Sequence, residues 1–314
     1  MLVGIDLGGT NIAIGLVDEK GKILKQDSTP TLGKRSADEI IDDMIALAEK
    51  VIYDANLSKD KIKGIGIGCP GAVDNKNGTI IFTENIPFSN YPISDRFKEY
   101  FDAPIHLEND ANAAAYGEYI VNGDNAGVFV AVTLGTGVGG GIIIDGKIFK
   151  GSNGVGAEIG HIPLILGGIE CGCGQKGCWE SYASATALIN QTKIAITKHP
   201  ESLMNTIAQK SSVVNGRTAF DAAKQGDKSA LEVVEKYIEY VAAGIVGIVN
   251  IFQPEKVVIG GGISKEGSYL IDPIIKFVRK YDYNQFFEPA KIEAAKLYND
   301  AGIVGAAMAA KNFL

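Results

Sequence analysis

One histidine and three cysteines carry the clearest chemistry in this sequence: His161, Cys171, Cys173 and Cys178. One imidazole and three thiols form the ligand set of a four-coordinate structural zinc site. Glu158 stands shortly before this group and Glu180 shortly after it. A bound metal would therefore hold two carboxylates close to one point, which suits a ligand rich in hydroxyl groups.

Other uses of the cysteines are open. The short spacing disfavours a disulfide between Cys171 and Cys173, and the start of the chain lacks the basic and apolar leader of a secreted protein. The Cys-x-Cys and Cys-x4-Cys spacings differ from the Cys-x-x-Cys of thioredoxin-like redox proteins. Zinc is the favoured interpretation, with a redox pair or free thiols as alternatives. Cys69 is far away in sequence and is expected to be a small buried hydrophobic residue.

Two segments of the chain resemble each other. Leu7 and Asp18 align with Leu134 and Asp145 at a fixed offset of 127 residues. Each segment predicts a strand, a glycine-rich turn, a second strand, a hairpin turn and a third strand. The duplication predicts an α/β protein with two similar halves and a cleft between them.

The glycine-rich turns are candidates for phosphate binding, because glycine leaves backbone N–H groups free to face an anion and threonine adds a hydroxyl. The candidate residues are Asp6, Gly8, Gly9 and Thr10 in the first turn, and Thr133, Gly135, Thr136 and Gly137 in the second. A third cluster, Gly260, Gly261 and Gly262, follows an apolar strand at the end where open α/β sheets usually bind ligands. Tight turns without a ligand are the alternative interpretation.

Asp110 is the carboxylate that we expect to act as a base. It stands where a strand predicted over 104–108 passes into a helix predicted over 111–120. As a base it would accept the proton of a hydroxyl that attacks phosphorus, typically a contribution of about 10²–10⁴-fold, with Mg²⁺ on the nucleotide. Its alternative role is to cap the helix. Asp6 better suits a role beside phosphate or a metal-bound water.

Composition is that of a globular enzyme. The chain has 314 residues, 46% of them hydrophobic, and a net charge of -7. The acidic balance argues against a nucleic-acid face, and no apolar run reaches the roughly 18 residues that span a membrane. A cytoplasmic enzyme is expected. Further helices are predicted over 37–55, 183–199, 229–252 and 301–312, and further strands over 63–68 and 257–259.

These motifs together resemble the ROK family of sugar kinases and sugar-responsive repressors, over nearly the whole chain. The matching segments are 6–10, 69–71, 108–112, 134–137, 156–161 and 171–180. The resemblance implies the duplicated, actin-like and ribonuclease-H-like (ASKHA) α/β fold. We expect one domain over 1–109 with 300–314, and a second over 110–299 with the second phosphate turn, the zinc motif and the nucleotide loop.

The resemblance also implies ATP-dependent phosphorylation of a hexose, usually at its 6-hydroxyl, with Asp110 as the base. The sugar contacts that it implies are Gly71, Asn85, Asn109, Asp110, Glu158, His161 and Glu180. His161 would bind zinc through one ring nitrogen and donate to a sugar hydroxyl through the other. D-Glucose is the first expectation. N-Acetylmannosamine, N-acetylglucosamine, fructose and allose are alternatives, because residues 83–95 are expected to shape the selectivity.

The repressors of this family carry a winged helix-turn-helix before the first phosphate turn. Asp6 lies too near the start of this sequence to leave room for one, so an enzyme is expected rather than a regulator. A non-catalytic sugar sensor is the alternative from another class. The family also implies a homodimer or homotetramer, with ATP as the phosphoryl donor and neither nucleic acid nor membrane as a partner.

Overall fold

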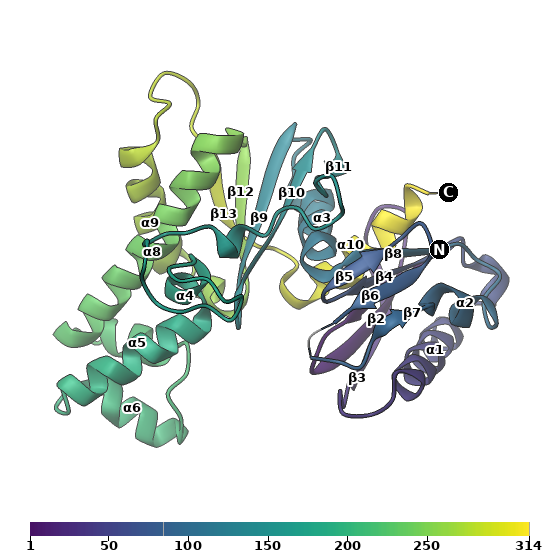
Figure 1. The fold of residues 1–314 in the computed structure, drawn as a ribbon, viewed down its shortest axis with the longest axis horizontal. Helices are drawn as coiled ribbons and strands as arrows, with labels where there is room; N and C mark the ends of the chain where they lie inside the picture. The colour runs from purple at the N-terminus through teal and green to yellow at the C-terminus, as the bar shows by residue number, and fades with distance from the viewer. Residues whose placement is uncertain (84, 314) are drawn as a thin grey trace. The chain divides into compact units, whose positions relative to one another are not determined.

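The computed structural model describes residues 1–83 and 85–313 and contains two compact units. The first unit comprises 1–125, 141–157 and 296–314, and the second comprises 126–140 and 158–295. Each unit contains strands of a five-stranded sheet with helices packed against it (Figure 1).

The sheet of the first unit has the strand order β3-β2-β1-β4-β8. The strands are β1 (Leu2–Leu7), β2 (Asn11–Val17), β3 (Ile23–Pro30), β4 (Gly64–Cys69) and β8 (Ile105–Asn109). The first three strands form an antiparallel meander, while β4 pairs in parallel with both β1 and β8. In this register Asp6 lies beside Gly68, and Gly68 lies beside Glu108.

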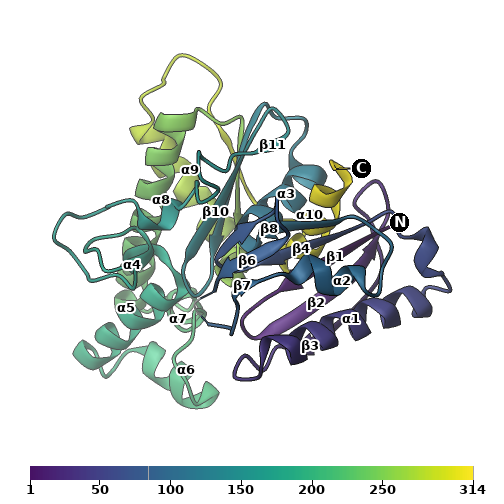
Figure 2. The same ribbon diagram turned by 45° about the vertical axis from the view of Figure 1, so that its right-hand side comes forward.

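Alternate residues of these strands face opposite sides of the sheet. Val3, Ile5 and Leu7 belong to a buried apolar core with the hydrophobic stripe of α1 (Ala37–Asp54). Figure 2 shows α1 along β2 and β3, which it contacts. Ser36 begins this helix in a capping box with Glu39. The side chain of each residue accepts the backbone N–H of the other, so two N–H groups without partners inside the helix are satisfied.

The opposite face of the first sheet carries Gly4 and Gly66 and is covered by α10 (Ala301–Lys311), the yellow helix of Figure 1. A Cβ added at Gly4 would lie 1.9 Å from the Ile303 carbonyl oxygen, and one at Gly66 would lie 1.8 Å from that of Ala306. Backbone therefore packs directly on backbone. The same holds where α3 (Asp110–Asn122) meets α10, since a Cβ at Gly305 would lie 1.6 Å from the Ala113 carbonyl oxygen.

Smaller elements complete the first unit. A three-stranded antiparallel sheet is formed by β5 (Ala72–Asp74), β6 (Thr79–Phe82) and β7 (Ser89–Tyr91), and α2 (Ile93–Lys98) follows it. The single-turn helices η1 (Lys59–Lys61) and η4 (Tyr298–Asp300) precede β4 and α10. Buried Glu118 of α3 accepts the N–H groups of Lys296 and Leu297 at 3.0 and 2.7 Å, which fixes the chain as it enters α10.

The second sheet has the order β11-β10-β9-β12-β13. Its strands are β9 (Val128–Leu134), β10 (Val138–Ile144), β11 (Lys147–Ile148), β12 (Lys256–Gly260) and β13 (Lys291–Ala294). β12 pairs in parallel with β9 and β13, and β10 pairs antiparallel with β11. The division between the two units falls within β10.

The helices of the second unit all lie after residue 158 in the chain. They are α4 (Glu180–Ala183), α5 (Ala185–Lys198), α6 (Leu203–Ser211), α7 (Thr218–Ala223), α8 (Lys228–Phe252) and α9 (Ser268–Tyr281), with single turns η2 (Ile159–His161) and η3 (Gly262–Glu266). The long α8 packs against α4, α5, α7 and α9. None of the helices in the described part of the chain is long and apolar enough to cross a membrane.

The predicted duplication is confirmed, because the two sheets share one strand order: third, second, first, fourth and fifth. The two hairpin turns also match. Gly21 and Gly146 have positive φ values of 84° and 75°, and Asp145 is left-handed as well. The compact units differ from the expected domain ranges. Because α3 packs closely on α10, it lies in the first unit together with 141–157, and not with the residues that follow it.

The glycine contact between α3 and α10 is testable. Gly305→Ala should lower the free energy of unfolding by about 1–3 kcal/mol, because the added methyl group overpacks a backbone contact. Urea denaturation followed by circular dichroism would measure the change.

Gly247→Ala in α8 is the matched control, since its added Cβ would meet no atom within 4 Å. Alanine has the higher helix propensity, so this control should gain about 0.5–1 kcal/mol. Equal stabilities for the two variants would contradict the close helix contact.

Candidate functional site

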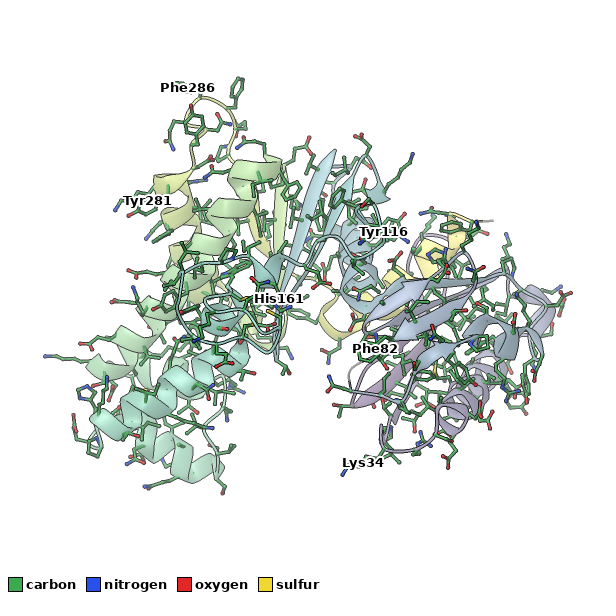
Figure 3. The ribbon with its side chains drawn as sticks, viewed as in Figure 1. Lys34, Phe82, Tyr116, His161, Tyr281 and Phe286 are labelled. Atoms are coloured by element: carbon green, nitrogen blue, oxygen red, sulfur yellow. The ribbon has the colours of Figure 1, made fainter. Side chains whose placement is uncertain are left out.

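His161, Cys171, Cys173 and Cys178 converge in the second unit, as the sequence predicted. Their ligand atoms all lie within 4.8 Å of one another. The Cys171 sulfur lies 3.7 Å from His161 Nδ1, and the Cys173 and Cys178 sulfurs lie 3.6 Å apart. Figure 3 labels His161 at this position.

This arrangement fits zinc. Zn–S bonds of about 2.3 Å in a tetrahedron place neighbouring ligand atoms about 3.8 Å apart, close to the separations found here. Burial and the thiols of Cys173 and Cys171 raise the pKa of Cys178 to about 12, and metal binding would replace that proton. The cluster is a His/Cys₃ set compatible with structural zinc. Cys69 lies outside the cluster and is fully buried in β4, as expected.

Trp179 anchors the cysteine loop to α8. Its side chain is fully buried, and its indole N–H donates to the Tyr240 carbonyl at 2.8 Å. A Cβ added at Gly244 would lie 2.0 Å from the indole ring, so this glycine provides the space for it. Because Trp179 stands between Cys178 and Glu180 in the chain, its anchorage fixes the last cysteine and the first residue of α4 together.

Glu180 joins the cysteine cluster to the second glycine turn. Its Oε2 accepts the Val138 N–H at 2.9 Å, and its Oε1 lies 3.6 Å from the Cys171 sulfur. A Cβ added at Gly137 would lie 2.1 Å from Glu180 Oε2. Gly137 therefore allows the carboxylate to reach the turn, and Glu180 has a structural role in addition to the sugar contact expected of it.

The segment from Glu158 to His161 reaches the same turn. His161 is the last residue of η2, and its N–H donates to the Glu158 carbonyl at 3.1 Å. A Cβ added at Gly160 would lie 2.1 Å from the Val138 carbonyl oxygen, so this single turn packs against the start of β10. The Glu158 side chain is exposed, whereas His161 is half-buried.

The third glycine cluster follows β12 and lies beside the end of β9. Gly260 pairs with Thr133 in the sheet, and a Cβ added at Gly261 would lie 2.2 Å from the Leu134 carbonyl oxygen. Gly261 has φ +86°, a conformation that favours glycine. The structure thus brings Thr133, the Gly135–Gly137 turn and Gly260–Gly262 together at the carboxyl ends of two parallel strands.

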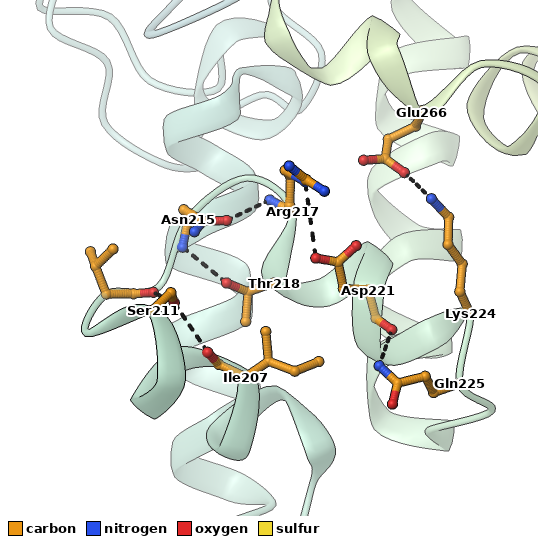
Figure 4. A network of polar contacts seen from close by, with 10 residues as sticks. Ile207, Ser211, Asn215, Arg217, Thr218, Asp221, Lys224, Gln225 and Glu266 are labelled. Atoms are coloured by element: carbon orange, nitrogen blue, oxygen red, sulfur yellow. Dashed lines mark hydrogen bonds and ion pairs between the residues drawn. The ribbon is translucent and has the colours of Figure 1, made fainter.

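Polar contacts hold the segment around α7 next to this loop. The backbone N–H of Asn215 donates to the Thr218 hydroxyl at 3.0 Å, and Lys224 pairs with Glu266 of η3 (Figure 4). A Cβ added at Gly216 would lie 2.7 Å from Ile263 Cδ1. The Arg217 side chain is 78% exposed and reaches Asp221 at 4.0 Å.

The first glycine turn lies in the other unit. The N–H of Gly8 donates to the Asn11 carbonyl at 2.9 Å, and the hydroxyl of fully buried Thr31 donates to the Gly8 carbonyl at 2.6 Å. A Cβ added at Gly9 would lie 3.8 Å from Asn85 Cβ, so Asn85 is a neighbour of this turn.

Asn109 and Asp110 occupy the junction between β8 and α3. Asn109 is the helix cap: its Oδ1 accepts the N–H groups of Ala111 and Asn112 at 3.0 and 3.2 Å. Its amide nitrogen donates to the carbonyl of Gly71 at 3.2 Å. Asn109 therefore holds the N-cap position, while the Asp110 carboxylate also accepts the N–H of Ala111 at 2.8 Å. Asp110 is the first residue of the helix, and Asn109 satisfies the turn that follows.

Asp6 and Asp110 both have raised pKa values. Burial, and then the nearby Asp110 carboxylate, raise the pKa of Asp6 to about 7. Burial also raises the pKa of Asp110, against the opposing effect of the Ala111 N–H. A Cβ added at Gly302 would lie 2.5 Å from Asp6 Oδ2, so Asp6 lies against the first turn of α10. Perturbed carboxyl groups of this kind are typical of functional sites.

The structure thus gathers the predicted residues in two groups, one in each unit. The first unit holds Asp6, Gly8, Gly9, Thr10, Gly71, Asn85, Asn109 and Asp110. The second holds Thr133, Gly135, Thr136, Gly137, Glu158, His161, Glu180, Gly260, Gly261, Gly262 and the three cysteines. Sequence patterns missed Thr31 and Trp179, whose partners lie far along the chain. They also gave no role to Glu108, which is buried in β8.

Two sheets with one shared topology and glycine turns define an actin-like protein of the ASKHA fold. The chain belongs to the ROK family, which matches residues 2–312. A glucokinase from Thermotoga maritima is 38% identical over 308 residues, which cover 98% of this chain and 96% of that protein.

Solved structures and regulators also resemble the chain. The crystal structure of a ROK family glucokinase from Streptomyces griseus, in complex with glucose and AMPPNP, has a TM-score of 0.83 and 37% identity, with 99% of each chain covered. A xylose repressor from Caldicellulosiruptor bescii is 29% identical, and the match covers 97% of this chain and 76% of that protein. The family therefore includes both kinases and regulators.

Removal of one thiol tests the metal site. Cys173→Ala should lose most of the zinc that purifies with the wild-type protein, about one ion per chain, and should melt at a lower temperature, because a structural site needs all four ligands. Elemental analysis by mass spectrometry would measure the metal.

Cys69→Ala is the control, since it removes a buried thiol outside the cluster. It should keep the zinc. Equal zinc contents in the Cys173→Ala and Cys69→Ala proteins would rule out a metal on the four predicted ligands.

Asp6 predicts a specific dependence of stability on pH. An aspartate has a pKa of about 4 in the unfolded chain. When its pKa is higher in the folded chain, the group stabilises the fold fully at pH values below the unfolded pKa. This contribution is lost as the pH rises to about 7. Asp6→Asn should therefore gain stability relative to wild type as the pH rises from 5 to about 8, in urea titrations without nucleotide or Mg²⁺.

Asp18→Asn provides a control of opposite sign. The N–H groups of Lys22 and Lys20 lower the pKa of Asp18, so this variant should lose stability relative to wild type once the pH exceeds the ordinary value for aspartate. A difference between wild type and Asp6→Asn that stays constant with pH would refute the perturbed pKa of Asp6.

Proposed function

We propose that the chain is an ATP-dependent hexose kinase that transfers the γ-phosphoryl group of ATP to the 6-hydroxyl of D-glucose. Relatives named glucokinase are 38% identical over nearly the full length, and a 37% identical ROK glucokinase was solved with glucose and AMPPNP. One observation carries the proposal: Asp110, a half-buried aspartate with a raised pKa, stands next to the asparagine that caps α3 at a strand-to-helix junction.

Asp110 is proposed as the catalytic base. Its carboxylate accepts the proton of the 6-hydroxyl as that oxygen bonds to the γ-phosphorus and the bond from phosphorus to the bridging oxygen of ADP breaks. The raised pKa brings the group closer to neutrality, where a general base transfers protons efficiently. Asn109, held by Gly71 and the helix start, is proposed to orient the sugar hydroxyls beside it.

Further sugar contacts are proposed for Asn85, Glu158, His161 and Glu180. His161 Nδ1 faces the Cys171 sulfur, so Nε2 is the nitrogen left to donate to a hydroxyl. Zinc, when bound, would act as a structural ion that fixes this ring and the cysteine loop. Acceptors such as Glu158 suit a polyol, because a site built for hydroxyls rejects analogues that lack them.

The glycine turns are proposed to bind the nucleotide phosphates. Gly8 to Thr10 and Gly135 to Gly137 offer threonine hydroxyls and backbone N–H groups to anionic oxygens. The N–H groups of Gly8 and Gly135 already donate within their turns, so the proposed donors are those of the residues that follow them. Gly260 to Gly262 offer a backbone without side chains beside Thr133. Mg²⁺, when bound with ATP, would neutralise phosphate charge. Asp6 is the carboxylate proposed to lie on the Mg²⁺ side of the site.

Glucose is proposed before other hexoses because of the named relatives. N-Acetylmannosamine, N-acetylglucosamine, fructose and allose remain alternatives, since residues 83–95 are expected to shape the selectivity and Glu84 lies outside the described residues. A sugar sensor remains the alternative class, given the xylose repressor among the relatives. A homodimer or homotetramer and a cytoplasmic location stay predictions from the sequence.

A panel of hexoses in a coupled assay for ADP tests the proposal. Glucose should give the highest kcat/KM, and Asp110→Asn should lower kcat by about 10²–10⁴-fold because the proton acceptor is lost. Glucose binding by this variant, measured by calorimetry, should stay close to that of wild type.

Three outcomes would each contradict a part of the proposal. A preference for an N-acetyl sugar would replace glucose as the substrate but leave the kinase. Sugar binding without turnover of any hexose would favour the sensor, and near-normal turnover by Asp110→Asn would remove Asp110 as the base.

A further inference from the structure

Glu108 is a buried carboxylate near the end of β8. It is 2% exposed, and His106, two residues earlier on the same face of β8, is 3% exposed. Removing a carboxylate from water is unfavourable unless it is paired and hydrogen-bonded. Its partners therefore indicate why the residue is there.

One oxygen of Glu108 holds the start of α3. Oε1 accepts the N–H of Asn109 at 3.2 Å and the side-chain amide of Asn112 at 3.4 Å. Asn112 is also buried, and Asn109 is the cap of the helix. Glu108 thus contacts Asn109, which precedes Asp110, and Asn112, which follows Asp110 by two positions.

The other oxygen pairs with Lys150. Its Oε2 lies 2.6 Å from Lys150 Nζ and 3.6 Å from His106 Nε2. Lys150 follows β11, and its carbonyl accepts the Gly156 N–H at 2.9 Å, which closes the loop between them. Gly156 stands two residues before Glu158 in the chain. The ion pair therefore joins the helix start to the segment that leads into Glu158.

The register of the sheet explains how Glu108 can act on Asp110. Asp6, Gly68 and Glu108 lie side by side on one face of β1, β4 and β8. A Cβ added at Gly68 would lie 3.7 Å from the Asp110 Cα, so Asp110 lies directly above the glycine. Asp110 has half-buried Asp6 on one side and buried Glu108 on the other, and of these two only Glu108 is hydrogen-bonded to Asn109 and Asn112.

We propose that Glu108 and Lys150 are positioning residues for phosphoryl transfer, a role that rests on the proposed kinase function. Their ion pair holds the Asn109–Asp110 junction and the segment before Glu158 in one geometry. A small displacement of a catalytic group can cost about 10²-fold in rate, so loss of the pair should act on kcat. Neither side chain needs to touch the substrate.

Lys150→Met tests the proposal in the full-length protein. It should lower kcat with glucose about 10- to 100-fold and leave the KM for ATP unchanged, because the nucleotide is bound by other residues. Lys150→Arg preserves the charge and should restore most of kcat. Lys147→Met is the matched control, since Lys147 is exposed and, like Lys150 and Tyr116, lines a cavity of about 280 Å³; its kcat should match wild type.

The double variant Glu108→Gln/Lys150→Met separates positioning from stability. Removing both charges relieves the unpaired buried carboxylate, so thermal stability should recover relative to Lys150→Met. The link to the loop stays broken, so kcat should remain low. Recovery of kcat together with stability would overturn the positioning role.

Hydrogen exchange gives a test that needs no turnover. The amides of Ala111 and Asn112 should exchange faster in Lys150→Met than in Lys147→Met. If wild type turns over no hexose, the proposed function fails, and the exchange rates alone decide whether the pair holds the helix start. Equal exchange in the two variants, or a kcat of Lys150→Met equal to that of Lys147→Met, would overturn the proposal.

Discussion

The candidate chemistry of the first unit depends on the missing side chain of Gly68. A Cβ there would lie 3.1 Å from Ala113 Cβ, closer than ordinary van der Waals contact, so the glycine lets the first turn of α3 lie close to the sheet. That contact places Asp110 between Asp6 and Glu108, the second-to-last residues of β1 and β8, where burial raises the pKa of Asp110. Gly4 and Gly66 allow α10 a still closer approach, and α10 in turn covers Asp6. Backbone packing, rather than a charged partner, sets the environment of Asp110.

The second unit uses the same device to gather distant segments at one turn. Gly137 admits the Glu180 carboxylate, Gly160 admits the start of β10, and Gly261 admits the end of β9. Three stretches that are far apart in the chain thereby meet at the junction of β9 and β10. The cysteine cluster contacts Glu180 through Cys171, and Trp179 fixes the cluster to α8. A metal there would stabilise a loop that the glycines already direct.

Local patterns predicted the elements well because each signal lies within the element itself. The stripe of α1, the repeated hairpins and the four metal ligands are all visible in short windows of sequence, and the structure has them. What failed or was missed depends on distant partners. Asn109 caps α3 in place of Asp110 because Gly71 and Glu108 orient it. The unit boundary falls after α3 because Gly117 and Gly305 let α10 pack on it from the far end of the chain.

The duplication also shows how two similar halves acquire different chemistry. Asp6 and Thr133 occupy equivalent positions, and each pairs with a glycine on the next parallel strand: Gly68 in one sheet, Gly260 in the other. In the first half the first turn of α3 packs on that glycine, and the residue beside it is a half-buried acid whose pKa is raised to about 7. In the second half the residue is a neutral hydroxyl beside Gly260. A carboxylate repels phosphate unless a cation lies between them, whereas a hydroxyl donates a hydrogen bond to phosphate directly. The exchange of aspartate for threonine at this repeated position therefore agrees with the metal-side role proposed for Asp6 and the phosphate-side role proposed for Thr133.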